Sequence, residues 1–381
     1  MMIRAKMNKA FLKIFGKEEW YLVTIPVFLI LLSFIVAAII IIFLGKNPFL
    51  AFYNLLQGSG LAPKPAYGGH KSMLTDFLSL LNYMTPMIFA SLSVAIALKG
   101  GLFNIGVSGQ MLFGGFFATI LVGYSGLDWA IAKPLVLIVG IIGGAIIGGL
   151  IGLLKHKFNI NEVVSSIMFN YIIQYVFSFF IHGYYIDPVS RQSKYISDAS
   201  RLTLVNVQMF NLKMDLSIGF IIAIILAIAV KVFLDKSRLG FEIKAVGANH
   251  KGANYAGINV GRTRVLTMLI SGAFAGLAGV TYYLGYFASI QPRVLPSMGF
   301  DAIAVALLGN LHSYGIIAAS FIISIIDKGS TYMSSKAGVR QEIASVITAL
   351  ILLFSACSVY VQHKIQSKKD NLEYKARKEI K

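Results

Sequence analysis

The polar residues that could do chemistry in this chain are few, and four of them gather in two glycine-rich segments. One segment runs GLFNIGVSGQ and holds Asn104 and Gln110; the other runs GFDAIAVALLGN and holds Asp301 and Asn310. Their amide and carboxyl groups can exchange hydrogen bonds with a passing solute, while the glycines disfavour an unbroken helix. Broken helices in the two halves of a membrane protein point to a substrate pathway. We therefore predict that these four residues line one.

Two of the polar features have a simpler explanation. Asp301 could serve merely as a cap of the short helix that starts there, because the positive end of a helix dipole favours an acid. Asn170 and Gln174 are four residues apart and so share a helix face. Hydrogen bonding between helices would account for them, although we also place Asn170 in the predicted pathway.

Catalytic and metal-binding patterns do not occur in the sequence. It has one cysteine, Cys357, six scattered histidines, no H-E-x-x-H run and no G-x-x-x-x-G-K-[ST] phosphate loop. These counts exclude a disulfide framework, a Cys-based metal site and ATP hydrolysis by a phosphate loop. We predict no catalytic, metal or cofactor site in this chain.

The composition requires a bilayer around most of the chain. Of 381 residues, 57% are hydrophobic and 13% charged, and the mean hydropathy is +0.74. Soluble proteins carry about 25% charged residues, so the chain cannot cover a water-facing surface. Its 34 Lys and Arg against 16 Asp and Glu give a net charge of +18. In a membrane protein this excess fits cytoplasmic loops and anionic lipid rather than nucleic acid.

Long stretches without charge mark the expected spans, since a helix needs roughly 20 residues to cross the hydrocarbon. They cover 20–45, 77–98, 100–127, 134–154, 163–186, 265–292, 302–326 and 343–363, with a further apolar run at 216–234. The stretch 302–326 is broken near Gly309 and Gly315, so it forms either two crossings or a re-entrant hairpin. We predict an all-α bundle of about ten spans, or eight plus a hairpin, with glycine-broken helices.

The distribution of Lys and Arg sets the expected orientation. With the N-terminus inside, cytoplasmic segments hold 21 of these residues and outer segments 12. By the positive-inside rule, both termini are cytoplasmic. The expected organisation is a basic N-terminus (1–19), a membrane domain (20–363) and a charged tail (364–381).

The largest internal cytoplasmic loop, 235–264, is a candidate contact with another protein. A membrane chain without a phosphate loop cannot itself energise uphill transport with ATP, so ATP-driven transport would require such a contact. Small and aromatic residues in the loop could supply apolar anchors for docking into a groove, whereas a merely solvated basic loop is the alternative. The residues that we predict to make this contact are Gly247, Asn249, Ala253, Tyr255, Ala256 and Gly257.

Four motifs in chain order carry a resemblance to a known family. They are GLFNIGVSGQ (101–110), EIKAVGANHKGANYAGINV (242–260), ISGAFAGLAG (270–279) and GFDAIAVALLGN (299–310). The chain resembles the permease subunits of bacterial ABC importers, in the branched-chain amino acid and simple-sugar superfamily, and within it the nucleoside and simple-sugar branch.

The resemblance implies a multi-pass subunit of the bacterial plasma membrane with several partners. These would be a second, homologous permease in a heterodimer, an ATP-binding subunit that holds ATP and Mg, and an extracellular substrate-binding lipoprotein. The 242–260 stretch would be the coupling helix. Nucleosides rank first as substrate and simple sugars second. An ion-coupled secondary transporter or a channel is the competing class, but it would place ionisable groups deep in its spans, where only Asp301 is a candidate.

Overall fold

The computed structural model describes residues 18–209, 212–356 and 367, and all structural statements below concern these residues. The predicted basic N-terminus up to residue 17 and nearly all of the predicted tail lie outside them. The helical elements are α2 (Glu18–Phe43), α3 (Pro48–Ser59), α4 (Met73–Lys99), α5 (Val107–Ala118), η1 (Thr119–Gly123), α6 (Trp129–Phe158), α7 (Glu162–Phe180), η2 (Ile181–Tyr185), η3 (Asp198–Ser200), α8 (Ile218–Lys236), α9 (Arg238–Ala248), α10 (His250–Tyr255), α11 (Val260–Val280), η4 (Thr281–Phe287), α12 (Met298–Leu308), α13 (Ser313–Ala337) and α14 (Glu342–Ala356).

Within the described residues, six helices are long and apolar enough to span a membrane, or seven if the bent pair α2 and α3 counts as one span. The six are 73–99, 129–158, 162–185, 218–236, 260–287 and 313–337. The chain is therefore a polytopic helical membrane protein. The finer count of ten spans, or eight plus a hairpin, stays a prediction.

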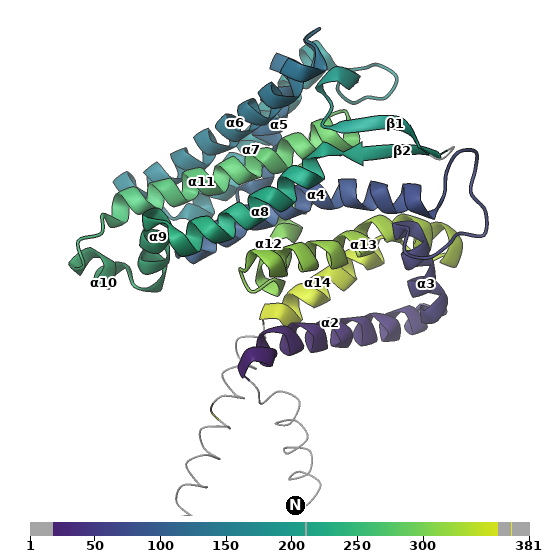
Figure 1. Cartoon of the computed structure of the whole chain (residues 1–381), viewed down its shortest axis with the longest axis horizontal. Coiled ribbons are helices and arrows are strands. Elements are labelled where there is room, and N and C mark those ends of the chain that lie inside the picture. The colour runs from purple at the N-terminus through teal and green to yellow at the C-terminus, as the bar shows by residue number, and fades with distance from the viewer. Residues whose placement is uncertain (1–17, 210–211, 357–366, 368–381) are drawn as a thin grey trace, which may run out of the picture.

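Helix α4 lies at the centre of the bundle and is buried from Met84 to Ala97. It packs against α8, α11, α12 and α13. Figure 1 shows α5, α6, α7 and α11 on one side of it, and α2, α3, α13 and α14 on the other. A helix that is apolar on all faces suits this position, because neighbouring helices cover it all round.

The glycines of α6 bring two backbones into contact, as their spacing predicts. A Cβ added at Gly144 would strike the carbonyl of Gly272 on α11, and one at Gly148 would strike the carbonyl of Met268. Small residues every four positions allow this approach in membranes, where packing rather than the hydrophobic effect joins helices. The α6–α11 pair is thus a close-packed unit beside α4.

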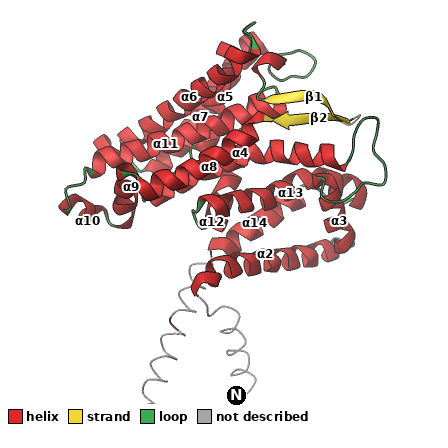
Figure 2. Ribbon diagram, viewed as in Figure 1, coloured by secondary structure: helices red, strands yellow, loops and turns green. Residues whose placement is uncertain are grey.

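One part of the chain departs from an all-α fold. Strands β1 (Thr203–Met209) and β2 (Leu212–Ser217) form an antiparallel hairpin that pairs Thr203 with Ser217, with a bulge between Leu204 and Val207. Figure 2 shows this hairpin, the only sheet among the described residues, at one end of the bundle. The run TLVNVQM alternates apolar and polar residues, which favours a strand over a helix. We call this the hairpin end; α9 and α10 mark the opposite, α10 end.

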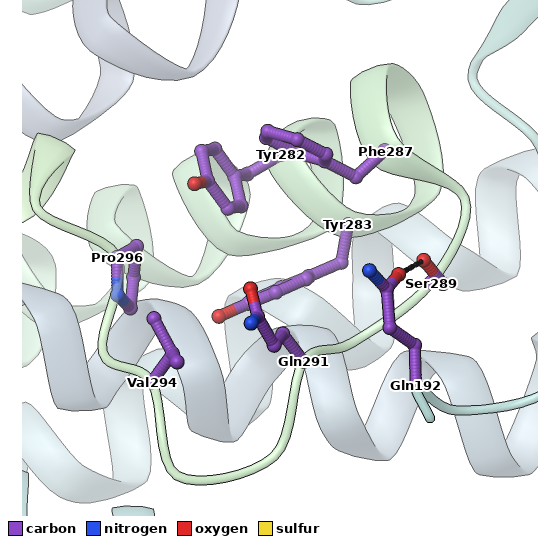
Figure 3. Close-up of a pocket in the computed structure, with 8 residues that line it drawn as sticks. All are labelled: Gln192, Tyr282, Tyr283, Phe287, Ser289, Gln291, Val294 and Pro296. Atoms are coloured by element: carbon purple, nitrogen blue, oxygen red, sulfur yellow. Dashed lines mark hydrogen bonds between the residues drawn. The ribbon is translucent and has the colours of Figure 1, made fainter. Parts of the chain in front are cut away.

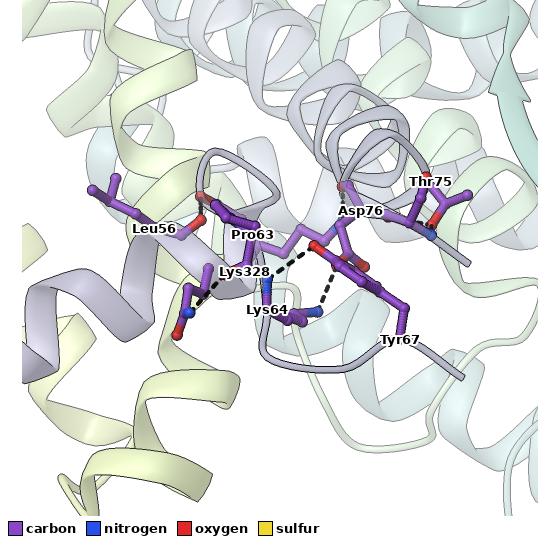
Figure 4. A network of polar contacts seen from close by, with 10 residues as sticks. Leu56, Pro63, Lys64, Tyr67, Thr75, Asp76 and Lys328 are labelled. Atoms are coloured by element: carbon purple, nitrogen blue, oxygen red, sulfur yellow. Dashed lines mark hydrogen bonds and ion pairs between the residues drawn. The ribbon is translucent and has the colours of Figure 1, made fainter. Parts of the chain in front are cut away.

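A polar network fastens the 60–72 loop at the hairpin end (Figure 4). The ammonium of Lys64 lies 2.6 Å from a carboxylate oxygen of Asp76, and its backbone N–H donates to the Tyr67 hydroxyl. Lys328 on α13 donates to the backbone carbonyl of Asp76 at 3.0 Å. The loop is therefore joined to both α4 and α13.

Candidate functional site: the α5–α12 junction and the α9–α10 surface

The chain leaves the helical conformation between α4 and α5, at residues 100–106. Gly101 has a φ of +70°, in the left-handed region that glycine adopts at no steric cost. The segment runs back along α4, because Asn104 reaches Ser271 on α11, and Ser271 in turn bonds to Ser93 of α4. Helix α5 therefore begins inside the bundle rather than at its end.

The two predicted amides of this segment bind each other. The Asn104 amide donates to Gln110 at 2.9 Å and to Ser271 at 2.8 Å, and it accepts from the backbone N–H of Gly106 at 3.0 Å. Gln110 donates back to Asn104 at 3.2 Å. Both side chains are fully buried. In this structure protein groups, rather than an open cavity, satisfy both amides.

Asn170 fixes the same segment from the side of α7. Its amide donates to the carbonyl of Ile105 at 3.1 Å and accepts from the N–H of Gly109 at 2.8 Å. These two bonds supply backbone partners that a regular helix would otherwise provide. Gln174, on the same helix, instead donates to the carbonyl of Arg293 at 2.6 Å.

The second predicted segment meets the first one at its start. Ser108 in the first turn of α5 donates to the carbonyl of Pro296 at 2.9 Å, and a Cβ at Gly299 would strike Ser108. Asp301 lies in the first turn of α12 and is half-buried. Asn310 follows the last turn of α12, where it is exposed and has a φ of +51°. The structure thus brings the starts of α5 and α12 together and leaves Asn310 at the far end of α12.

The link between η4 and α12, residues 288–297, enters the bundle from the hairpin end. The segment that precedes the hairpin holds it there: Ser193 N–H donates to Ile290, and Ile196 N–H donates to Ala288. Ala288 and Arg293 have φ values of +61° and +59°. Backbone strain in non-glycine residues occurs mostly at functional sites, so this link is a candidate for one.

A pocket opens beside this link (Figure 3). Its volume is about 90 Å³. The Ser289 hydroxyl donates to the Gln192 amide at 2.6 Å across its rim. The pocket combines aromatic faces with two side-chain amides, and its lining residues are Gln192, Tyr282, Tyr283, Phe287, Ser289, Gln291, Val294 and Pro296.

Sequence reasoning missed the pocket and one acidic residue. A run of tyrosines near the end of a span suggests an interfacial belt, but Tyr283 is only 4% exposed and packs inside the protein. Asp327 ends the charge-free stretch 302–326, which predicts that it lies outside a span, whereas α13 continues to Ala337. The small and polar residues after Asp327 hide this continuation from a hydropathy scan.

The predicted contact loop forms two short helices at the α10 end, and its residues differ in accessibility. Tyr255 is 92% exposed, and Ala256 and Gly257 are exposed beside it. Ala253 is buried, and Asn249 caps α10 by accepting from the N–H groups of Lys251 and Gly252. A docking partner could therefore reach Tyr255, Ala256 and Gly257 directly, while Ala253 and Asn249 shape the helix.

Gly247 touches the break before α5. A Cβ at Gly247 would strike the carbonyl of Lys99 and approach Gly101. Helix α9 therefore rests on the 99–101 turn from which the α5 segment starts. A groove of about 270 Å³ lies beside α9. Its lining residues are Arg238, Phe241, Glu242, Ala256, Gly257, Ile258, Asn259 and Arg262.

Comparison with known proteins identifies the family. Residues 77–356 match the family described as the permease component of branched-chain amino acid transport systems. No solved structure matches the chain.

Three similar proteins are permeases of ABC transporters. The nucleoside permease NupB of Lactococcus lactis is 34% identical over 89% of this chain and 92% of its own length. The guanosine permease NupP of Bacillus subtilis is 35% identical over 76% of this chain and 84% of its own. The glucose permease TsgB13 of Haloferax volcanii is 29% identical over 72% of this chain and 74% of its own. This chain therefore belongs to the family of permease components of branched-chain amino acid transport systems.

Proposed function

We propose that this chain is the transmembrane permease subunit of an ATP-driven ABC importer for nucleosides, with simple sugars as the second candidate. Two relatives of 34% and 35% identity are named for nucleosides or guanosine, whereas the glucose permease is less similar. A nucleoside is neutral and rich in hydroxyl groups. The side-chain amides and aromatic faces that line the pocket beside the 288–297 link suit such a solute better than fixed charges would.

The junction of α5 and α12 carries the most weight for this function. A loop enters from the hairpin end as far as Pro296, where it meets Ser108; α12 then leads toward the α10 end (Figure 1). Irregular backbone at membrane depth survives only where protein or a water-filled cavity surrounds it. Loop and half-helix together form the kind of discontinuous crossing that transporters place along their pathways.

The orientation follows from the same features. The hairpin end would face the outside and the α10 end the cytoplasm of a bacterial cell, because the loop 235–264 at the α10 end holds six Lys and Arg residues. Both termini would then be cytoplasmic. The outer cap, which includes Gln192 and the hairpin, would receive substrate from a binding lipoprotein.

Energy would enter through α9 and α10. An ATP-binding subunit, which would hold ATP and Mg, would contact Tyr255, Ala256 and Gly257. Gly247 would pass the displacement to the 99–101 turn, and hence to the start of α5. A second, homologous permease would complete the pathway, as the family resemblance implies.

A secondary transporter remains the competing function, and one observation favours it. Asp301 and Asp327 both lie half-buried within the bundle, and ion-coupled carriers use carboxylates in such places. The ABC proposal has the stronger support, because the three relatives above are named as ABC permeases and this chain matches most of the length of each.

The test is nucleoside-stimulated ATP hydrolysis by the assembled complex. The purified chain alone should hydrolyse no ATP. Together with an ATP-binding subunit, a second permease and a nucleoside-loaded binding protein, it should show ATPase activity that rises with nucleoside. A complex in which Tyr255→Asp replaces the wild-type chain is the matched control, since a charge at the exposed tip should prevent docking. Equal ATPase activity with and without this chain would refute the proposal.

A further inference from the structure

The pocket beside the 288–297 link has an aromatic wall, which η4 provides (Figure 3). The ring centroid of Tyr282 lies 5.0 Å from that of Tyr283 and 4.7 Å from that of Phe287. Phe287 is 47% exposed, so part of its ring is open to a ligand. The segment η4 is π-helical, and such segments are rare and frequently occur at functional sites. None of the eight lining residues is charged, so the pocket suits a neutral, flat ligand.

The opposite, polar wall consists of Gln192, Ser289 and Gln291. The residues that follow the first two bond to each other twice. The N–H of Ser193 donates to the carbonyl of Ile290 at 2.9 Å, and the N–H of Ile290 donates to the hydroxyl of Ser193 at 2.9 Å. These two bonds hold Gln192 and Ser289 next to each other at the rim.

Both sides of the rim have an unusual backbone conformation. Arg191 directly precedes Gln192 and has a φ of +55°, and Ala288 directly precedes Ser289 and has a φ of +61°. Residues other than glycine rarely adopt such values, and they occur mostly at ligand clamps and active sites. The backbone at the rim therefore supports a ligand site here.

The two glutamines have hydrogen-bonding groups to spare. The Ser289 hydroxyl donates to the carbonyl oxygen of the Gln192 amide at 2.6 Å, so the NH2 group of Gln192 has no partner in the described part of the chain. The exposed Gln291 side chain has none there either. An amide offers a donor and an acceptor side by side. This pattern pairs with the edge of a nucleobase.

The pocket is closed in this structure. Its volume is about 90 Å³, whereas a ring the size of benzene fits a cavity of roughly 150 Å³. The bond between Ser289 and Gln192 crosses the rim (Figure 3). Breaking this bond frees the Gln192 side chain to turn away from the rim and widens the entrance.

We propose that this pocket binds the heterocyclic base of a nucleoside, and that the Gln192–Ser289 bond is the latch that closes it; this rests on the proposed function. The base lies against the rings of η4, and the amides of Gln192 and Gln291 pair with its edge. Aromatic stacking combined with hydrogen bonds to the edge is how proteins bind unpaired bases. A simple sugar has neither a flat ring nor such an edge, so the pocket favours nucleosides over sugars.

The experiment measures how far a nucleoside protects a thiol in the pocket. The complex of this chain, the second permease and the ATP-binding subunit is prepared without the binding protein, in a Cys357→Ser background that removes the one natural cysteine of the chain. Gln291→Cys then places a thiol in the polar wall. Uridine or guanosine at a concentration about four times its Kd should slow modification of this thiol by a water-soluble maleimide about fivefold. Glucose and ribose at the same concentration should leave the rate unchanged.

Val189→Cys is the matched control. Val189 is 92% exposed in the turn that precedes Gln192 and does not line the pocket. Its rate of modification should not respond to the nucleoside. Val294→Cys, at a second exposed position of the pocket lining, gives the same readout if Gln291→Cys does not assemble.

Two further variants test the latch and the aromatic wall. Ser289→Ala removes the latch, and the loss of a neutral hydrogen bond shifts an opening equilibrium roughly two- to tenfold. The thiol at position 291 should therefore react faster by that factor when no ligand is present. Phe287→Leu keeps an apolar side chain but removes the flat face. Because the loss of base stacking lowers affinity at least about fivefold, the nucleoside concentration that gives half-protection should rise by that factor.

Uptake by the complete transporter, with binding protein and ATP, separates the inference from the proposed function. If the wild-type complex takes up no nucleoside, the proposed function fails, and the pocket proposal with it. If uptake is normal and neither pocket thiol is protected, the proposed function stands and this pocket is not the base site. Equal protection by glucose would overturn the selection by base. An unchanged reaction rate in Ser289→Ala would overturn the latch.

Discussion

The substitution Asn104→Ala should destabilise the start of α5 severely. The side chain makes four hydrogen bonds in a fully buried position, two of them with Gln110. Without it, both ends of the Gln110 amide and the N–H of Gly106 lose their partners. Ser271 keeps its bond with Ser93 and is not left unpaired. Three polar groups lose their partner: the carbonyl oxygen and the NH2 group of Gln110, and the N–H of Gly106.

Each unpaired buried group costs roughly 1–3 kcal/mol. Even at the low end of that range, Asn104→Ala should therefore lower the free energy of unfolding by about 3 kcal/mol. Gln110→Ala should cost less, since it leaves only Asn104 and not the backbone of Gly106 short of partners. The double variant should cost less than both single variants combined, because the two side chains satisfy each other.

Thermal unfolding of the purified protein in detergent measures the effect. Asn254→Ala is the matched control, since it removes the same side chain from an exposed position on α10 and should change stability by less than about 0.5 kcal/mol. If the melting temperature of Asn104→Ala lies within a degree of that of the wild-type protein, the amide network does not stabilise the non-helical segment 100–106.

Three further results are expected. Gly144→Ala should abolish or strongly lower folding yield, because a methyl group there strikes the backbone of α11, whereas Gly149→Ala on the same helix meets only an ordinary contact; fluorescence-detected size exclusion compares the two. Gly247→Leu should push α9 off the carbonyl of Lys99 and uncouple ATP hydrolysis from uptake, so unchanged uptake per ATP hydrolysed would count against that path. Hydrogen bonds from a serine hydroxyl and two backbone N–H groups lower the pKa of Asp187. The stabilisation of its turn is therefore present at neutral pH and is lost as the pH falls through that lowered pKa, below the usual value of about 3.9. Amide hydrogen exchange in this turn, measured after brief exposure to acid, should detect the loss.

The long apolar helices and the close helix packing at the glycine repeats could be predicted from the sequence, because hydropathy and a four-residue glycine repeat are local signals. Gly140, Gly144, Gly148 and Gly152 indicate that a second backbone comes close to their helix, and Gly272 and Gly276 indicate the same for theirs. That these two helices pack against each other is known only from the structure. The hairpin was not predicted, since a short alternating run inside a polar cap carries a weak signal. The length of α13 was underestimated, because Asp327 interrupts the charge-free stretch.

The identity of the polar residues at the α5–α12 junction was predictable, but their partners were not. Asn104 and Gln110 stand out as amides among glycines in an apolar chain. Ser271 and Ser93, which complete their network, lie far away in sequence on helices where a serine is unremarkable.

The central claim is that this chain conducts a nucleoside with energy supplied by a partner ATPase. Uptake of labelled uridine into proteoliposomes tests it most directly, with the chain present either alone or in the complete complex. We predict accumulation against the gradient only in the complete complex and only with ATP. Accumulation by the chain alone, driven by an ion gradient without ATP, would contradict the claim and identify a secondary transporter.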